Sequence, residues 1–123
     1  MPKKRAGSYI IVWRYRVRRG AEARFERIYG PRGTWARLFR KSHGYLGTQL
    51  FREAGRDVPR SPRKAGRSKD RPLQSTRYVT IDMWRSRAHF DAFHRRHHGE
   101  YQRIDALCES LTLHEERLGA WAL

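Results

Sequence analysis

The stretch RYVTIDMWRSRAHFDAFHRRHHGEY, residues 77–101, decides the fold, because it predicts a strand that runs directly into a helix. In residues 78–84, β-branched and aromatic side chains occupy both alternating faces, which is typical of a strand covered on both sides. Ser86 follows where a helix N-cap belongs. Beyond it, side chains at helical spacing begin with phenylalanine and continue with histidine, which predicts one wall of a cavity: Phe90, Phe93, His94, His97 and Tyr101.

The part of the chain before this stretch shows a similar order of elements. Residues 9–17 alternate as a strand, and residues 21–29 predict a short helix. Pro31 interrupts that helix, because proline lacks a backbone donor and clashes with the preceding turn. Thr34 is expected to cap a second helical piece, and residues 45–53 alternate as the second strand.

Two basic segments stand apart from these elements. Residues 1–7 predict a disordered basic lead, and residues 55–76 predict a flexible basic insertion between the second and third strands, because almost no bulky apolar side chain occurs there. After the helix that opens at Ser86, Gly99 is expected to bend the chain, and residues 112–123 predict a fourth strand.

The element order is therefore β-α-β-β-α-β, which predicts an α+β, ferredoxin-like fold in one domain, residues 8–123. Such a fold has a four-stranded antiparallel sheet with helices on one face. The other face would expose a large apolar area, and a second copy of the chain is the simplest cover, so we expect a homodimer.

Composition narrows the class of protein. The 123 residues fit one domain, and no apolar run approaches the roughly 20 residues that span a membrane. The single cysteine, Cys108, excludes an internal disulfide and a cysteine-cluster metal site, and we expect a cytoplasmic protein. The net charge of +16 would attract anionic partners, although arginines dispersed over solvated faces are its more ordinary explanation. Nucleic-acid binding, if present, is expected to be weak and non-specific.

Four segments carry a resemblance to a known family. They are IIVWRYRV (10–17), FERIYGPRGTWARLF (25–39), GYLGTQLF (44–51) and YVTIDMWRSRAHFDAF (78–93). In these segments the chain resembles the antibiotic biosynthesis monooxygenase family of the dimeric α/β-barrel superfamily. The resemblance extends over about residues 9–121, apart from the insertion.

The resemblance implies a homodimer with a ligand cavity in each subunit, between the sheet and its helices. Some members of the family oxygenate aromatic polyketides with dioxygen and without metal or flavin, so it implies no cofactor. Other members degrade haem and carry an asparagine in the first strand and a tryptophan and a histidine on the late helix. Trp13, Phe93 and Arg103 stand at the matching positions here, which argues against haem degradation.

Three titratable side chains are candidate catalytic groups: His94, His97 and Asp82. A histidine with an ordinary pKa near 6.5 suits a general base, although a core or surface role is an equally ordinary explanation. Asp82, in an apolar strand, needs either an ion-pair partner such as Arg14 or a raised pKa. No HExxH pattern occurs among the histidines, and no metal site is expected.

The candidate substrate-binding residues are mostly aromatic, and each of these has core filling as its alternative role. They are Trp13, Arg14, Tyr15, Trp35, Tyr78, Trp84, Phe93 and Tyr101. We expect an antibiotic biosynthesis monooxygenase-like protein, a cofactor-independent oxygenase acting on an aromatic or quinonoid small molecule. The alternatives are a non-enzymatic small-molecule-binding or interaction domain and a basic nucleic-acid-associated protein.

Overall fold

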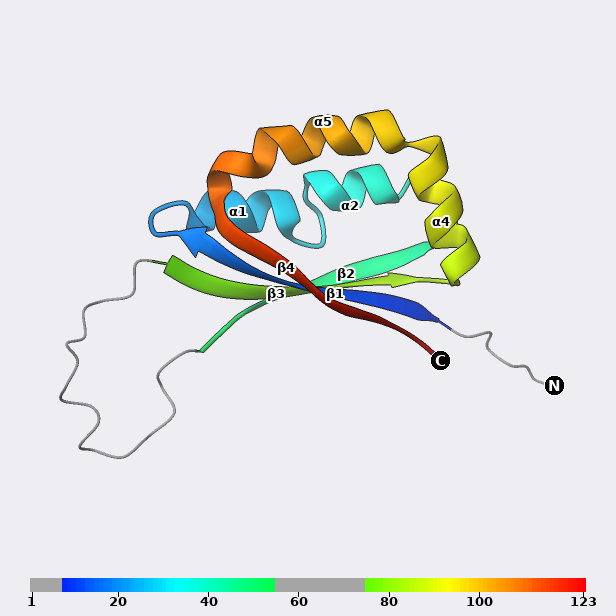
Figure 1. Ribbon diagram of the computed structural model, residues 1–123, viewed down its shortest axis with the longest axis horizontal. Coiled ribbons are helices and arrows are strands. Elements are labelled where there is room, and N and C mark those ends of the chain that lie inside the picture. Colours follow the sequence, from blue (N-terminus) through cyan, green and yellow to red (C-terminus); the bar gives the residue numbers. More distant parts are fainter. Residues whose placement is uncertain (1–7, 55–74) are drawn as a thin grey trace.

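The computed structural model describes residues 8–54 and 75–123, in which helices and strands follow the predicted order (Figure 1). The predictions for the basic lead and for residues 55–74 of the insertion, including any role in nucleic-acid binding, lie outside the described residues. The elements are β1 (Tyr9–Arg18), α1 (Glu22–Tyr29), α2 (Thr34–Phe39), β2 (Tyr45–Arg52), β3 (Ser75–Trp84), α4 (Arg87–Arg96), α5 (His98–Cys108), a 3-10 turn (Glu109–Leu111) and β4 (Thr112–Ala122).

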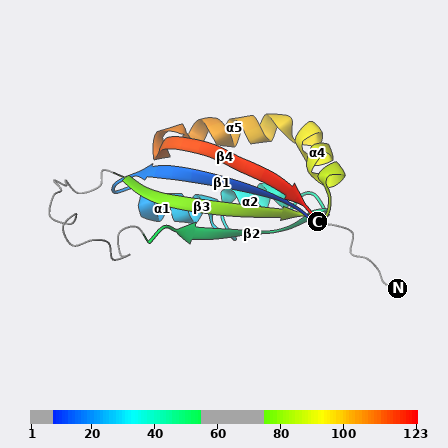
Figure 2. The ribbon, with the colours of Figure 1, turned by 60° about the horizontal axis from the view of Figure 1, so that its bottom comes forward.

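The four strands form one antiparallel sheet in the order β2-β3-β1-β4, and the helices lie over one face of it (Figures 1 and 2). This arrangement confirms the predicted α+β, ferredoxin-like fold. None of the described helices is long and apolar enough to cross a membrane.

The stretch that decides the fold begins two residues earlier than predicted, because β3 starts at Ser75. Ser86 caps α4 as predicted: its Oγ accepts a 3.1 Å hydrogen bond from the backbone N–H of His89. The bend expected at Gly99 lies at His97 instead, where φ −113° and ψ 26° end α4 and begin α5.

The prediction that Thr34 caps the second helical piece is wrong, since Thr34 is already the first residue of α2. The cap position belongs to Gly33, which makes no side-chain cap. A Cβ at Gly33 would lie 2.4 Å from the backbone oxygens of Arg27 and Ile28, so only glycine fits where α2 begins against the end of α1.

The core lies between the sheet and the helices and is largely aromatic. Trp84 is fully buried at the end of β3 and contacts the rings of Phe39, Phe90 and Phe93 at centroid distances of 5.2–5.5 Å. Burial of this many rings fixes the helices over one end of the sheet. The other buried apolar side chains are Tyr9, Ile11, Tyr15, Val17, Phe25, Tyr29, Trp35, Ala36, Leu38, Tyr78, Cys108 and Leu111.

No described helix covers the opposite face of the sheet, which we call the outer face (Figure 2). Strand alternation places Ile81 on this face, and its register partner on β1 is Val12. The next row pairs Met83 with Ile10, and Ile10 with Trp121 of β4, whose side chain is 51% exposed. The outer face is thus apolar in its centre.

Candidate functional site

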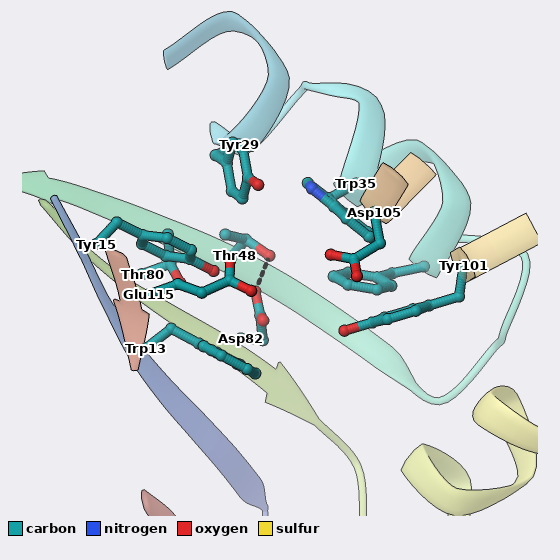
Figure 3. Close-up of a pocket in the computed structure, with 11 residues that line it drawn as sticks. Trp13, Tyr15, Tyr29, Trp35, Thr48, Thr80, Asp82, Tyr101, Asp105 and Glu115 are labelled. Carbon is teal, nitrogen blue, oxygen red and sulfur yellow. Dashed lines mark hydrogen bonds between the residues drawn. The ribbon is translucent and has the colours of Figure 1, made fainter. Parts of the chain in front are cut away.

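A pocket opens between the inner face of the sheet and helices α1, α2 and α5 (Figure 3). Its atom-free space, which includes open solvent at the mouth, is about 460 Å³. All four strands contribute side chains. The lining residues are Trp13, Tyr15, Tyr29, Trp35, Phe39, Thr48, Thr80, Asp82, Tyr101, Asp105 and Glu115.

Aromatic rings form two sides of the pocket. On the sheet, the rings of Trp13 and Tyr15 lie nearly parallel with their centroids 6.1 Å apart. On the helical side, the rings of Trp35 and Tyr101 lie 4.8 Å apart and tilted (Figure 3). A flat ligand between these pairs would contact apolar ring faces, which also exclude water.

A single carboxylate lies among these rings on β3. Asp82 Oδ1 accepts a 2.7 Å hydrogen bond from the Thr48 hydroxyl, and the Tyr45 hydroxyl lies 2.5 Å from that same Thr48 oxygen. Burial raises the pKa of Asp82 to about 6, and the Thr48 hydrogen bond opposes the rise. The group is therefore a base near neutral pH that remains protonated in mild acid.

Three tyrosine hydroxyls of the pocket stay protonated at neutral pH. Burial raises the pKa of Tyr101 to about 12, with the nearby carboxylates Asp105, Glu115 and Asp82 adding to the rise. Burial also raises the pKa of Tyr15 and of Tyr29 well above the ordinary value. These phenols can donate hydrogen bonds to a ligand oxygen.

Two further carboxylates line the pocket, Asp105 on α5 and Glu115 on β4. Burial raises the pKa of Glu115, and the negative charge of Asp105 adds to the shift. The sequence predictions omitted both residues. Asp105 could have been found from the sequence, because it lies four residues after Tyr101 on the same helix face. Glu115 stands opposite Tyr15 across the sheet, and this can be known only from the β1–β4 register.

The indole N–H of Trp35 is a buried donor that has no partner. The Trp35 side chain lines the pocket, the residue is 8% exposed, and its Nε1 finds no hydrogen-bond acceptor among the described residues. The Tyr29 hydroxyl (Figure 3) and the Cys108 sulfur lie near this nitrogen, but neither completes a hydrogen bond with it. An unmet donor in a pocket wall costs stability unless a ligand or water satisfies it.

The structure brings five of the predicted site residues together around the pocket: Trp13, Tyr15, Trp35, Asp82 and Tyr101. Trp84 and Phe93 are core residues instead. Tyr78 is also buried outside the pocket, where its hydroxyl donates a 2.5 Å hydrogen bond to Glu26. The sequence predictions missed Tyr29, Phe39, Thr48 and Thr80, whose inward direction depends on packing rather than on residue type.

Arg14 lies on the outer face, where it pairs with Glu116 at 3.5 Å. The expectation that it neutralises Asp82 is therefore wrong, because adjacent positions on β1 point to opposite faces and Asp82 points inward. The raised pKa, the other explanation considered for Asp82, holds instead.

The two candidate histidines do not line the pocket. His94 packs against Phe90, Phe93 and Tyr101 at 4.3, 5.3 and 4.8 Å between ring centroids, and burial lowers its pKa. His97 Nδ1 lies 2.9 Å from a carboxylate oxygen of Glu100. Of these three neighbours of His94, Tyr101 is the one that lines the pocket.

No cluster of three or more histidine, cysteine, aspartate or glutamate residues suited to a metal ion occurs in the two described ranges. Cys108 is buried, as its place on the apolar stripe predicted.

No family model matches the chain, and no curated protein does. Solved structures do match. SnoaB, a cofactor-independent oxygenase from Streptomyces nogalater, is 21% identical with a TM-score of 0.64, over 94% of this chain and 92% of that chain. A Bacillus cereus protein assigned as an antibiotic biosynthesis monooxygenase is 9% identical with a TM-score of 0.58, over 94% and 92%. These matches show that the chain shares its fold with these two proteins.

Proposed function

We propose that the pocket is the active site of a cofactor-independent oxygenase that acts on an aromatic or quinonoid small molecule. The observation that carries the proposal is Asp82, a carboxylate with a pKa of about 6 set among aromatic rings. A base works best when its pKa lies close to the working pH. SnoaB, which has a similar fold, is a cofactor-independent oxygenase, and this likeness supports the same class of chemistry.

The reaction needs only the substrate, dioxygen and a base. Asp82 takes a proton from a phenol or enol, which makes an electron-rich carbanion at a ring carbon. That carbanion supplies the electrons that reduce dioxygen. Where the carbon is a methylene, it loses two hydrogens and gains one oxygen atom as a carbonyl, and the second oxygen atom leaves as water.

The remaining lining residues would position the substrate and exclude water. Trp13 lies on the sheet side of the pocket and Trp35 on the helix side, so a flat ring system could bind between them. The protonated hydroxyls of Tyr15 and Tyr101 suit hydrogen bonds to the substrate's oxygens. His94 and His97 have a lesser part in this proposal, since they act on the pocket only from behind its wall.

The proposed working form is a homodimer in the cytoplasm, joined through the outer faces of two sheets. Half-buried Val12, Val79 and Ile81 and the more exposed Phe51 and Trp121 form an apolar surface of the kind that a second subunit covers. A buried lone cysteine, Cys108, is compatible with a reducing compartment.

Oxygen consumption tests the proposal. Protein freed of metals by chelation and of flavin by refolding would be mixed with naphthols and anthrones, and an oxygen electrode would record uptake. We expect uptake above the buffer rate, and a decrease of about 10²–10⁴-fold in Asp82→Asn. The matched control is Asp91→Asn, which removes a carboxylate on α4 that pairs with Arg87 away from the pocket. Uptake that is absent, or unchanged in Asp82→Asn, would contradict the proposal.

A further inference from the structure

The charge of the pocket is opposite to that of the protein. The chain carries 28 lysines and arginines against 12 aspartates and glutamates. Three of those acids nevertheless converge on one pocket, Asp82, Asp105 and Glu115, and none of the described lining residues is a lysine, arginine or histidine.

These three carboxylates also lack the ion pairs that other acids of the protein make. Glu26, Glu100 and Glu116 each lie within 4.0 Å of a basic side chain, at 3.5, 2.6 and 3.5 Å. No such pair involves Asp82, Asp105 or Glu115 in the described part of the chain. In an arginine-rich protein, three unpaired carboxylates in one cavity leave a negative potential that a ligand can neutralise.

Arg117 is the arginine of β4 and lies two residues after Glu115. It stands opposite Trp13 in the register of the sheet, so its side chain is on the inner face. Its guanidinium lies over the ring of Phe90, 6.0 Å from the centroid, rather than against one of the three carboxylates. Arg117 therefore does not remove the negative charge of the pocket.

Two features besides the carboxylates indicate what such a ligand contains. The rings of Trp13, Trp35 and Tyr101 suit a cation through their electron-rich faces. The indole N–H of Trp35, buried in the pocket wall without an acceptor, calls for an oxygen or nitrogen acceptor on the ligand. Figure 3 shows this N–H on the helical side of the pocket and the carboxylates of Asp82 and Glu115 on the strand side.

We infer that the pocket binds an aromatic molecule that carries a protonated amine, with the ammonium held by Asp105 and Glu115 and an acceptor atom held by Trp35 Nε1. The inference names the substrate class of the site and rests on the proposed function for its catalytic meaning. Binding alone tests it. Asp82 is left as the base, and Asp105 and Glu115, nearer the exposed rim, supply the recognition.

The probes are three naphthols that differ in one substituent: aminomethyl, which is cationic, hydroxymethyl, which is neutral, and carboxylate, which is anionic. Calorimetry without dioxygen measures their dissociation constants on the full chain, so that no turnover interferes. We expect the aminomethyl naphthol to bind about tenfold more tightly than the hydroxymethyl naphthol, and the carboxylate to bind least. Equal affinities, tighter binding of the neutral or anionic probe, or no binding at millimolar concentration would overturn the inference.

Substitutions locate the effect. Asp105→Asn and Glu115→Gln should each remove most of the tenfold preference, whereas Asp91→Asn, which makes the same charge change on α4, should retain it. Both test residues are exposed, so their variants are expected to fold. A preference that survives in both test variants would overturn the inference.

Trp35→Phe tests the donor. The substitution should weaken the binding of the aminomethyl naphthol several-fold. The affinity for naphthylmethylammonium, which has no phenol oxygen, should stay unchanged. An equal loss for both probes would contradict the assigned role of the indole N–H. Oxygen uptake by the neutral naphthol is read separately, so failure of the charge preference does not decide whether the protein is an oxygenase.

Discussion

Thr48 and Asp82 stand directly opposite each other on β2 and β3, and the Thr48 hydroxyl donates a 2.7 Å hydrogen bond to Asp82 Oδ1. Since that hydroxyl gives its proton to the carboxylate, the Tyr45 hydroxyl at 2.5 Å is the donor to Thr48. The chain Tyr45–Thr48–Asp82 holds the ionised carboxylate in one orientation. Without it, burial alone would push the pKa of Asp82 higher.

Replacing Thr48 with valine should shift the pH dependence of the reaction. The wild-type kcat/KM is expected to rise with pH through an apparent pKa of about 6, because the ionised carboxylate is the base. Thr48→Val removes a hydrogen bond to a charged group, worth about 1.5–3 kcal/mol, so the rise should move to higher pH. A pH profile of kcat/KM between pH 4 and 9 measures this.

The matched control is Thr76→Val. Thr76 also donates a 2.7 Å hydrogen bond to a carboxylate, that of Glu22, but outside the pocket. The other titratable groups around Asp82 are Tyr15, Tyr45 and Tyr101, which stay protonated in this range, and the pocket carboxylates Asp105 and Glu115. Those two carboxylates are the same in the wild type and in Thr48→Val, so they cannot shift one profile against the other. An unshifted profile in Thr48→Val, or the same shift in Thr76→Val, would refute the role given to Thr48.

Asp82→Asn should stabilise the protein at neutral pH while it abolishes activity. Burial raises the pKa of Asp82 from 3.8 to about 6, so the folded state holds this proton more tightly than the unfolded state. Stability is therefore lost as pH rises between these values, by about 2–3 kcal/mol, and the loss is complete above pH 6. An asparagine avoids this loss, and its oxygen can still accept from Thr48.

Urea unfolding at pH 4 and pH 8 measures the difference. The free energy of unfolding of Asp82→Asn should exceed that of the wild type at pH 8 and approach it at pH 4. Asp91→Asn, whose carboxylate is only surface-paired with Arg87, should show a difference under 1 kcal/mol at both pH values. A variant less stable than the wild type at pH 8 would show that the carboxylate is stabilised by contacts rather than strained by burial.

A charge in the centre of the outer face should prevent dimer formation. Ile81 stands between Val12 and Gln49 in the sheet register, so Ile81→Glu would bury an unpaired carboxylate in the proposed interface. Light scattering after size exclusion should give a dimer for the wild type and a monomer for this variant. Ala92→Glu, on the exposed side of α4, is the control and should stay dimeric. A monomeric wild type at tens of micromolar would end the proposal of a homodimer.

His94→Phe should have a small effect on the reaction. His94 contacts Tyr101 at 4.8 Å between ring centroids but does not line the pocket, so a phenylalanine of similar shape can maintain that packing. We expect kcat/KM to fall less than about tenfold, with KM changing more than kcat. The kcat/KM of His97→Phe, which removes a contact with Glu100, is expected to fall even less. A decrease of 10²-fold or more in kcat for either variant would make that histidine the base and remove Asp82 from the role.

The order of elements could be predicted from the sequence because alternation and helical spacing are local. Tyr78, Thr80, Asp82 and Trp84 share one face of a strand whatever lies above them. The predictions failed where long-range packing decides. Thr34 has the right chemistry for a cap, but the close approach of α2 to the end of α1 gives that place to Gly33.

Only part of the pocket could be predicted from the sequence, because long-range packing decides the rest. Five aromatic or acidic residues were identified by type and face, but Trp84 and Phe93 have the same pattern and belong to the core. Whether an aromatic ring fills the core or lines a cavity depends on how far the helices stand from the sheet, which no local pattern records. Glu115 could not be predicted as a pocket residue, because only the register of β4 places it opposite Tyr15.

The most direct test of the account is the fate of isotopically labelled dioxygen. Metal- and flavin-free protein would be incubated under labelled dioxygen with an anthrone or naphthol that it consumes, and mass spectrometry would follow product and water. The account predicts one labelled oxygen atom in the product carbonyl and the other in water, with both signals lost in Asp82→Asn. Unlabelled product, or labelling that appears only after a metal or flavin is added, would contradict it.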